Sequence, residues 1–316
     1  TARSVLCRRS LSGCAPFKWF EYLFNNKFVM HYLKYFILFI FSGCFFLNSC
    51  DVIDEPFKDN TFIPIDTSST IIGDTLVQTE RAVIVEDFTG HRCKNCPKAS
   101  KAIRDLDSLF GSKIVPLAIH AGPSNFTGTN NDYPIDFTTQ EGDNIATHFG
   151  IFALPMGLVQ RLDYPNSHQK TYSAWSALTF LELAKSPEAL FSLNAKYDSL
   201  SRTAVLNYSV ELSSNQTNPL WIAVYIKESE IIAPQLMPNN ARNETYIHKN
   251  VFRNAPLGPL GNLISQNGGE VGQIFNGSIT SNLDPLWNAK ECEWVILLYD
   301  KSNYKVIQPG STLVYP

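Results

Sequence analysis

The sequence predicts an α/β domain followed by an all-β sandwich domain. In residues 82–120, two apolar runs typical of buried strands flank a segment whose apolar residues have helical spacing. After residue 186 the apolar residues recur at every second position, which is typical of strands with one buried face. We therefore place the boundary near residue 187, with the α/β domain over 75–187 and the sandwich over 188–316.

The N-terminal sequence is typical of an exported lipoprotein. Residues 30–49 combine a short basic start with an apolar run, which is shorter than the roughly 20 residues that span a membrane. The run ends in Leu-Asn-Ser-Cys at 47–50, which resembles a lipobox, so we predict cleavage before Cys50 and lipid attachment to it. Cys44 is a weaker alternative, because cleavage there leaves large apolar residues in the tether.

Two segments flank this signal sequence. Residues 1–29 precede a complete signal, so we interpret them as an over-extended start, with a true N-terminal segment as the alternative. Residues 50–74 are mostly polar and contain two prolines and a Thr-Ser-Ser-Thr patch. This composition predicts a tether between the lipid and the folded part of the chain.

Composition limits the kinds of partner. The formal net charge is −3 and no basic block is present, which argues against nucleic acid as a partner. Hydrophobic residues make up 44% of the chain, enough to supply two ordinary cores. No phosphate-binding motif follows a predicted strand, and we expect no cofactor.

The first domain is predicted to alternate strands and helices. The predicted strands are 82–88, 114–120 and 157–162, and the predicted helices are 97–110, 140–149 and 171–185. The first strand, helix and strand imply a parallel pair joined by a right-handed crossover. Residues 121–139 are too long for an ordinary connection, so we predict an excursion beside the active face.

The second domain is predicted to consist of short strands. The clearest of them are 191–197, 204–212, 221–226 and 294–299. Polar turn sequences follow two of these strands, and no helical pattern separates them. This favours an antiparallel sandwich that is immunoglobulin-like in general form.

A Cys-x-x-Cys motif, Cys93 to Cys96, lies between the first strand and the first helix. The free N–H groups and the positive dipole end of a helix favour the thiolate over the thiol. Arg92 and Lys94 add positive charge beside it. We predict that Cys93, as the more exposed cysteine, attacks a partner, and that Cys96 resolves the mixed disulfide.

Two other interpretations of the motif remain open. An inert disulfide is one, although a bridge that closes so short a loop removes little chain entropy. A metal site is the other, and it needs two further ligands, for which His91, His120 and His148 are the candidates. We predict a redox pair and no metal. His120 is expected to be a packed residue at a strand end, and Cys292 a small apolar residue at the start of a strand.

The Cys-x-x-Cys motif and its surroundings resemble the corresponding segment of the thioredoxin-fold oxidoreductases. In that family an acidic residue six positions before the first cysteine accepts a proton, and an aromatic residue follows it; Asp87 and Phe88 hold these positions. The resemblance implies that a half-buried Asp87 with a raised pKa takes the proton of Cys96. The family's cis-proline, which faces the two sulfurs, is matched by Pro155.

The motif departs from the usual thioredoxin sequence at three positions. Arg92 stands where Trp is usual, and Lys94-Asn95 stands where Gly-Pro is usual. We place these three residues and Leu154 along the substrate groove. Because the middle dipeptide strongly influences the reduction potential, the redox direction stays open.

The chain is also similar to the 28-kDa outer-membrane-protein family of surface lipoproteins. The similarity covers the lipobox, the Glu-Asp-Phe-Thr-Gly-x-x-Cys-x-x-Cys-Pro motif at 86–97, the Leu154-Pro155 turn, and a β-rich end that includes 248–253 and 299–308. The resemblance implies lipid anchoring at the outer membrane, on its periplasmic side or its surface, and no defined substrate.

Two functions follow from this sequence. The first is thiol–disulfide exchange with thiols or disulfides of exported proteins, carried out by a membrane-anchored protein. The second is a surface binding or adhesion lipoprotein for which the thioredoxin fold is a scaffold, since a fold by itself implies no function.

Overall fold

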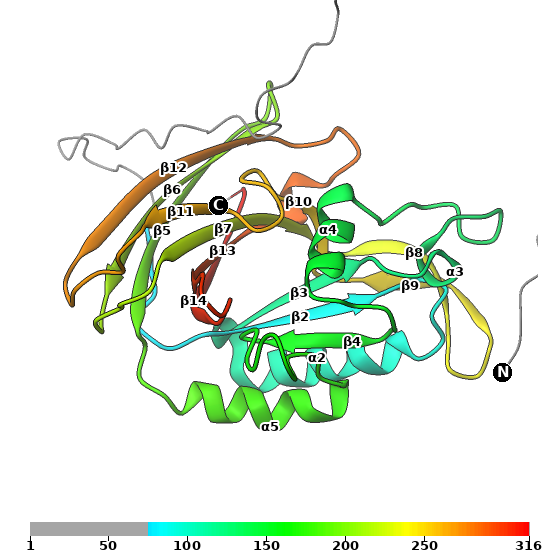
Figure 1. Cartoon of the computed structure of the whole chain (residues 1–316). Helices are drawn as coiled ribbons and strands as arrows, with labels where there is room; N and C mark the ends of the chain where they lie inside the picture. The colour runs from blue at the N-terminus through cyan, green and yellow to red at the C-terminus, as the bar shows by residue number, and fades with distance from the viewer. Residues whose placement is uncertain (1–74, 316) are drawn as a thin grey trace, which may run out of the picture. The chain divides into compact units, whose positions relative to one another are not determined.

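The computed structural model describes residues 75–315 of the chain (Figure 1). The predicted start segment at 1–29, signal sequence at 30–49 and tether at 50–74, with the lipid site at Cys50 and its alternative at Cys44, lie outside the described residues. Within 75–315, no helix has the length and apolar character needed to cross a membrane.

The predicted strand–helix–strand unit is confirmed. Strands β2 (Val83–Thr89) and β3 (Ile114–His120) are parallel along their whole length, and helix α2 (Cys96–Phe110) connects them. The helix forms because its apolar residues recur at three- and four-residue spacing and its first turn contains Pro97, a residue that favours helix starts.

Strand β4 (Met156–Val159) pairs antiparallel with β2. It ends before the predicted Leu162, because Gln160 and Arg161 adopt φ angles of 51° and 52°, outside the β region. Helices α2 and α5 (Tyr172–Leu183) cover one face of these strands, and α4 (Gln140–His148) packs on the other (Figure 1).

The chain after residue 187 is almost entirely strand. The strands are β5 (Ala189–Asp198), β6 (Thr203–Leu212), β7 (Leu220–Glu228), β8 (Ile231–Leu236), β9 (Arg242–His248), β10 (Val251–Asn254), β11 (Asn262–Ser265), β12 (Ile274–Asn282), β13 (Cys292–Asp300) and β14 (Val306–Leu313). The four strands expected from the sequence correspond to β5, β6, β7 and β13. The described chain is thus mostly β-sheet with few helices.

Two sheets pack face to face. One has the strand order β1-β5-β6-β12, where β1 is Leu76–Val77. The other has the order β14-β13-β7-β10-β3-β2-β4, and β11 also pairs with β7. Apolar side chains of β5 and β6 share one core with those of β7, β13 and β14. Burial between the two sheets is therefore the main apolar contact of the C-terminal part.

Strand β10 connects the two parts of the larger sheet. It pairs parallel with β3, where Val251 lies opposite Ala118, and antiparallel with β7, where Val251 lies opposite Glu228. Strands from both sides of the boundary expected near residue 187 consequently belong to one sheet. The sequence pattern contains no signal for this pairing.

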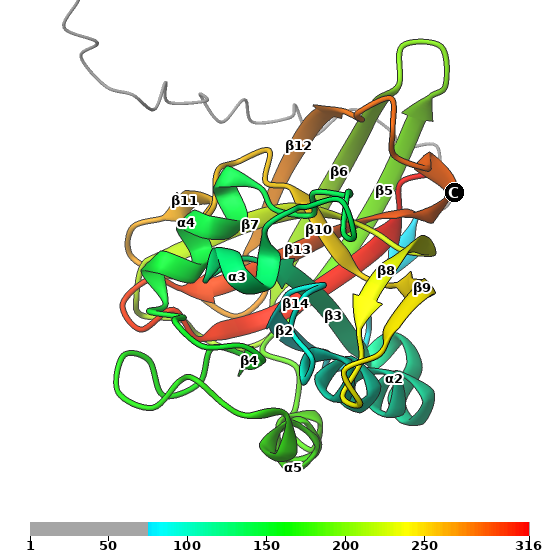
Figure 2. The same ribbon diagram turned by 90° about the vertical axis from the view of Figure 1, so that its right-hand side faces the viewer.

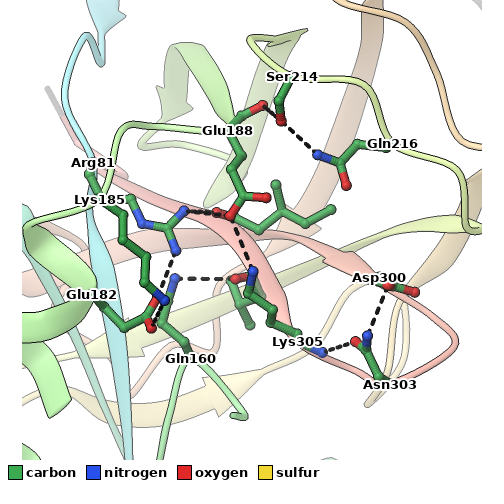
Figure 3. A network of polar contacts seen from close by, with 12 residues as sticks. Arg81, Gln160, Glu182, Lys185, Glu188, Ser214, Gln216, Asp300, Asn303 and Lys305 are labelled. Carbon is green, nitrogen blue, oxygen red and sulfur yellow. Dashed lines mark hydrogen bonds and ion pairs between the residues drawn. The ribbon is translucent and has the colours of Figure 1, made fainter.

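A polar network also connects segments far apart in the sequence (Figure 3). Arg81, just before β2, is buried and pairs with Glu182 of α5 at 3.0 Å and with Glu188 at 3.6 Å. It also donates to the carbonyl of Ile307 in β14. Lys305 reaches Glu188 at 3.2 Å. These contacts hold α5, β5 and β14 together beside the start of β2.

Strands β8 and β9 form a hairpin of their own. Among the described strands they pair only with each other. Figures 1 and 2 show this hairpin past the ends of β2 and β3, at the same end of the sheet as the short helix α3 (Ser124–Thr127), which belongs to the expected excursion. The hairpin therefore lies at the end of the sheet where the Cys-x-x-Cys motif lies.

Candidate redox site

The cysteine motif follows directly after strand β2. Cys93 and Cys96 form a disulfide, with their Cα atoms 5.4 Å apart. Cys96 is the first residue of α2, and its N–H donates to the carbonyl of Cys93 at 3.2 Å. No acidic residue lies in the first turn of the helix, so its positive dipole end faces the sulfur without a counter-charge from that turn.

Both cysteines are buried. Cys93 is 2% exposed and Cys96 is 1% exposed, so the difference in exposure expected between them is very small and neither is freely accessible. The reason is that neighbouring segments cover the loop: Arg92 N–H donates to the carbonyl of Phe126 at 2.9 Å, and strand β8 lies on another side. Only Lys94 and Asn95 of the motif are exposed.

Arg92 is held by the excursion and does not point freely into a groove. Its guanidinium donates to the carbonyl of Gly128 at 3.1 Å, the same oxygen that lies 3.2 Å from His91 Nε2. The carbonyl thus orients a cation and an imidazole beside the cysteine loop. Lys94 remains the exposed cation of the motif itself.

Asp87 is more deeply buried than the half-buried carboxyl expected from the sequence. It is 1% exposed, and neither carboxyl oxygen has a hydrogen-bond partner. This burial raises its pKa from 3.8 to about 8. Asp87 lines a small cavity of about 30 Å³ together with Ser100 of α2, whose hydroxyl donates to the carbonyl of Cys96 at 3.3 Å. A cavity of that size holds about one water molecule.

The segment before β4 carries the residues expected in the groove. The Leu154–Pro155 peptide bond is cis, and both residues are half-buried. Leu154 lies beside Gly122, at the start of the excursion. Phe152, two residues earlier, is 79% exposed. The structure therefore presents an apolar rim at this turn.

Three histidines form a buried cluster that the sequence did not predict as a unit. The ring centres of His91 and His120 are 6.5 Å apart, and those of His120 and His248 are 5.8 Å apart. Phe137 packs against both His120 and His248 at 4.7 Å. His148, the third candidate metal ligand, instead contacts Tyr304 at 4.5 Å, away from this cluster.

Burial lowers the pKa of each imidazole in the cluster. The pKa of His248 falls to about 4, that of His120 lies well below its usual 6.5, and that of His91 is also lowered. Within residues 75–315, no group of three or more His, Cys, Asp or Glu side chains has the arrangement of a metal site. The cluster is consequently a set of neutral rings at neutral pH.

Gln235 is a further residue that sequence reasoning missed. It is buried in β8, and its side-chain amide donates to the carbonyls of Gly90 and Cys93. No signal in the sequence links residue 235 to residue 93. Cys292 lies in the separate core of the two sheets, fully buried, where burial raises its pKa to about 12.

The fold and the site together define a mostly β-sheet protein with a buried Cys-x-x-Cys disulfide at the start of a helix. Residues 142–314 match the family model of outer membrane protein Omp28, which covers more than half of the chain. The chain therefore belongs to the Omp28 outer membrane protein family, which confirms the resemblance and the location at the outer membrane expected from the sequence. The matched residues begin after the disulfide.

Comparison with solved structures gives distant similarities. A protein from Agrobacterium tumefaciens is 12% identical, with a TM-score of 0.44, and the match covers 75% of this chain and 96% of that one. A domain of the outer membrane lipoprotein Omp28 from Porphyromonas gingivalis is 16% identical, with a TM-score of 0.29, over 41% of this chain and 89% of that one. No curated protein matches the sequence.

Proposed function

We propose that this protein is a thiol–disulfide oxidoreductase with a thioredoxin-like site, anchored to the outer membrane by lipid at Cys50 and acting on exported proteins. The observation that carries the proposal is the buried carboxyl of Asp87 on the same face of β2 as α2, the helix that begins with Cys96. Strongly shifted pKa values next to a reactive group are typical of functional sites.

The chemistry assigned to this site is a reversible exchange. The Cys93 thiolate attacks one sulfur of a partner disulfide; a mixed disulfide forms and the partner's other thiolate leaves. Cys96 passes its proton to Asp87 and attacks the Cys93 sulfur, which gives the Cys93–Cys96 disulfide and releases the second partner thiolate. The reverse sequence oxidises a partner dithiol, with the same proton transfer in the opposite direction.

The surroundings supply the other roles. Asp87, with a pKa of about 8, is partly ionised near neutral pH and can therefore accept or donate a proton. Residues 75–187 would act as the thioredoxin-like domain, with Leu154 and Pro155 shaping the groove and Lys94 and Asn95 on its rim. Residues 188–316 would be the immunoglobulin-like part, with no assigned chemistry.

The test is a set of single cysteine variants. In Cys96→Ser, the mixed disulfide cannot be resolved, so disulfide-linked partners should accumulate in an envelope extract and disappear on reduction. Cys93→Ser should trap none and should lose insulin reduction. Cys292→Ser is the matched control and should keep the activity of the unaltered chain. Insulin reduction that survives Cys93→Ser would contradict the proposal.

A second function has an observation in its favour. Both cysteines are at most 2% exposed, as expected of a structural bridge in a surface binding lipoprotein. The reduction potential separates the two functions. A value of roughly −120 to −270 mV is typical of exchange catalysts, and a value below about −300 mV is typical of structural disulfides. In the second case, Cys93→Ser/Cys96→Ser should retain ligand binding.

A further inference from the structure

The β8–β9 hairpin lies directly over the cysteine loop. The Gln235 amide donates to the carbonyls of Gly90 at 3.4 Å and Cys93 at 3.3 Å. The N–H of Leu236 donates to the carbonyl of His91 at 2.8 Å. Three hydrogen bonds thus fasten one strand of the hairpin to the loop and exclude a partner from that side of the disulfide.

Little apolar contact holds the hairpin in this position. It shares only a small core cluster, in which Ala233 packs with Phe137 and Val251 and Ile231 is partly buried. Its cross-strand pair Ile232 and Ile247 is 63% and 45% exposed. Segments with few buried apolar contacts are the ones that open at low free-energy cost. Detachment of the hairpin would expose few apolar side chains and would break the contacts of Arg242 with Asp132 and Tyr133 in the excursion.

The two ends of the hairpin are suited to act as a hinge. Glu230 and Asn250, which flank it, have φ angles of 58° and 57°, and Lys249 pairs with Glu230 at 2.8 Å. The carbonyl of Asn250 accepts from the N–H of Ala118 in β3 at 2.7 Å, which fixes the base. The tip at 238–240 is exposed. A rotation at the base would move Gln235 away from Cys93.

The histidine cluster spans the seam between the hairpin and the redox loop. His248 is the last residue of β9, His120 ends β3, and His91 lies in the loop that carries Cys93. Both nitrogens of His120 and Nε2 of His248 have no hydrogen-bond partner. Backbone hydrogen bonds at Gly128 and at Ala233 and Pro234 partly compensate a positive charge on His91 and His248, respectively, but nothing of this kind compensates a charge on His120.

We propose that the β8–β9 hairpin is a lid over the Cys93–Cys96 disulfide and that protonation of the His91–His120–His248 cluster opens it. This inference rests on the proposed function, because a lid controls access to the exchange centre. Protonation places like charges 5.8 to 6.5 Å apart in a buried seam, and separation of the hairpin returns them to water.

The charges around the histidine cluster also favour opening of the hairpin when the cluster is protonated. The surrounding charged and titratable groups are Arg92, Arg253, Arg104, Lys249, Asp136 and Asp87, together with Tyr133 and Tyr246, whose rings contact His91 and His248. Arg92 and Arg253 disfavour imidazolium, whereas Asp136 favours it at His91. Asp87, with a pKa of about 8, is protonated below neutral pH and gives no compensating charge.

The direction of the pH effect follows from the shift at His248. In the closed state its pKa is about 4, and in an open, hydrated state it returns toward 6.5. The open state therefore binds more protons, so closure is favoured above pH 6.5 and weakens as the pH falls toward 4. For this one group, lowering the pH from 7 to 5 should increase the ratio of open to closed chains roughly twenty-fold.

The rate of reduction by tris(2-carboxyethyl)phosphine measures how accessible the Cys93–Cys96 disulfide is. The phosphine attacks a sulfur, the disulfide becomes two thiols, and the phosphine becomes its oxide with oxygen from water. The full chain, purified in detergent, is reduced at pH 7 and pH 5, and its rate is divided by that of an oxidised peptide of residues 90–97, which has no lid. We expect the normalised rate to rise roughly twenty-fold from pH 7 to pH 5.

Three variants separate the lid from other effects. Gln235→Ala should raise the normalised rate already at pH 7, because it removes two bonds to the loop. His248→Phe keeps a ring in the seam but cannot be protonated, so it should abolish the rise at pH 5. His148→Phe, outside the cluster, should retain the rise. A normalised rate that does not change with pH, or a rise that survives His248→Phe, would overturn the proposal.

The lid and the exchange function can fail separately. The phosphine assay requires access but no catalysis, whereas insulin reduction requires both. If the pH-dependent rise is present while Cys96→Ser traps no partner, the lid stands and the exchange function fails. If partners are trapped while the normalised rate changes neither with pH nor on the substitution Gln235→Ala, the exchange function stands and the lid is overturned.

Discussion

Arg161 and Glu86 form an ion pair in which neither side chain is exposed. Arg161 Nη2 lies 2.6 Å from Glu86 Oε1, and Nε lies 2.9 Å from Oε2. The same guanidinium donates to the Tyr225 hydroxyl of β7 at 3.1 Å and lies over the rings of Phe149 and Tyr299. One buried cation thus joins β2, the end of β4 and α4 to the strands that follow residue 187.

Breaking this pair should strongly destabilise the protein. Glu86→Gln removes the negative charge and leaves the guanidinium of Arg161 buried without a counter-ion, so we expect a loss of about 3–5 kcal/mol in the free energy of unfolding. Urea denaturation measures it. Lys101→Met, which removes an exposed pair with Asp105, is the control and should change stability by less than about 1 kcal/mol. Equal effects at the two sites would contradict this account.

The Asp87 carboxyl should make stability depend on pH. Its pKa is raised to about 8 in the folded chain from 3.8, so the folded state binds a proton that the unfolded state releases over this range. The stability from this group is complete below pH 3.8 and is lost as the pH rises through the folded pKa, at up to about 1.4 kcal/mol per pH unit.

The variant Asp87→Asn removes the titrating carboxyl, so the free energy of unfolding should depend less on pH in the variant than in the unaltered chain. Its stability relative to the unaltered chain should increase by roughly 2.6 kcal/mol between pH 5 and pH 7. Urea denaturation at pH 5, 6 and 7, with the disulfide kept oxidised in both proteins, provides the comparison. A difference between variant and parent that stays constant over this range would show that Asp87 is ionised in the folded chain.

The local structure of the redox segment follows directly from the sequence. The apolar run before the motif and the helical spacing after it predict β2 and α2, and the next apolar run coincides with β3. The position of Asp87 relative to Cys93 is predictable for the same reason, since both belong to one continuous strand and loop. Properties set by neighbours in the chain are thus the predictable part of the site.

The burial of the site depends on contacts that the sequence does not encode locally. Strand β10 is four residues long, and its pairing with β3 joins segments more than 130 residues apart. Gln235 reaches Cys93 over a separation of 142 residues. The pattern of β8 and β9 gives no strong alternation, since exposed polar residues dominate β9. The exposure of Cys93 could not be predicted from the sequence, because it depends on the position of the β8–β9 hairpin over the cysteine loop.

Gly157 should not tolerate a side chain. A Cβ atom there would lie 2.7 Å from the carbonyl oxygen of Glu86 and 2.7 Å from Cε2 of the buried Trp175. Since the carbonyl is part of the β2–β4 pairing, it cannot move away, and Gly157→Ala should cost about 1–3 kcal/mol. At Gly310 the nearest atoms are side-chain carbons at 3.2–3.3 Å, so Gly310→Ala should cost less in the same denaturation assay.

Cys292 should be chemically silent in the folded protein. Its side chain is fully buried between the two sheets, and its pKa is raised to about 12, so the reactive thiolate is almost absent at neutral pH. Iodoacetamide should therefore leave Cys292 unmodified in native buffer and modify it in urea, as read by peptide mass spectrometry. After reduction, Cys93 should react faster than Cys292 once the hairpin opens. Native modification of Cys292 at the rate of Cys93 would mean that the core between the sheets opens as readily as the redox loop.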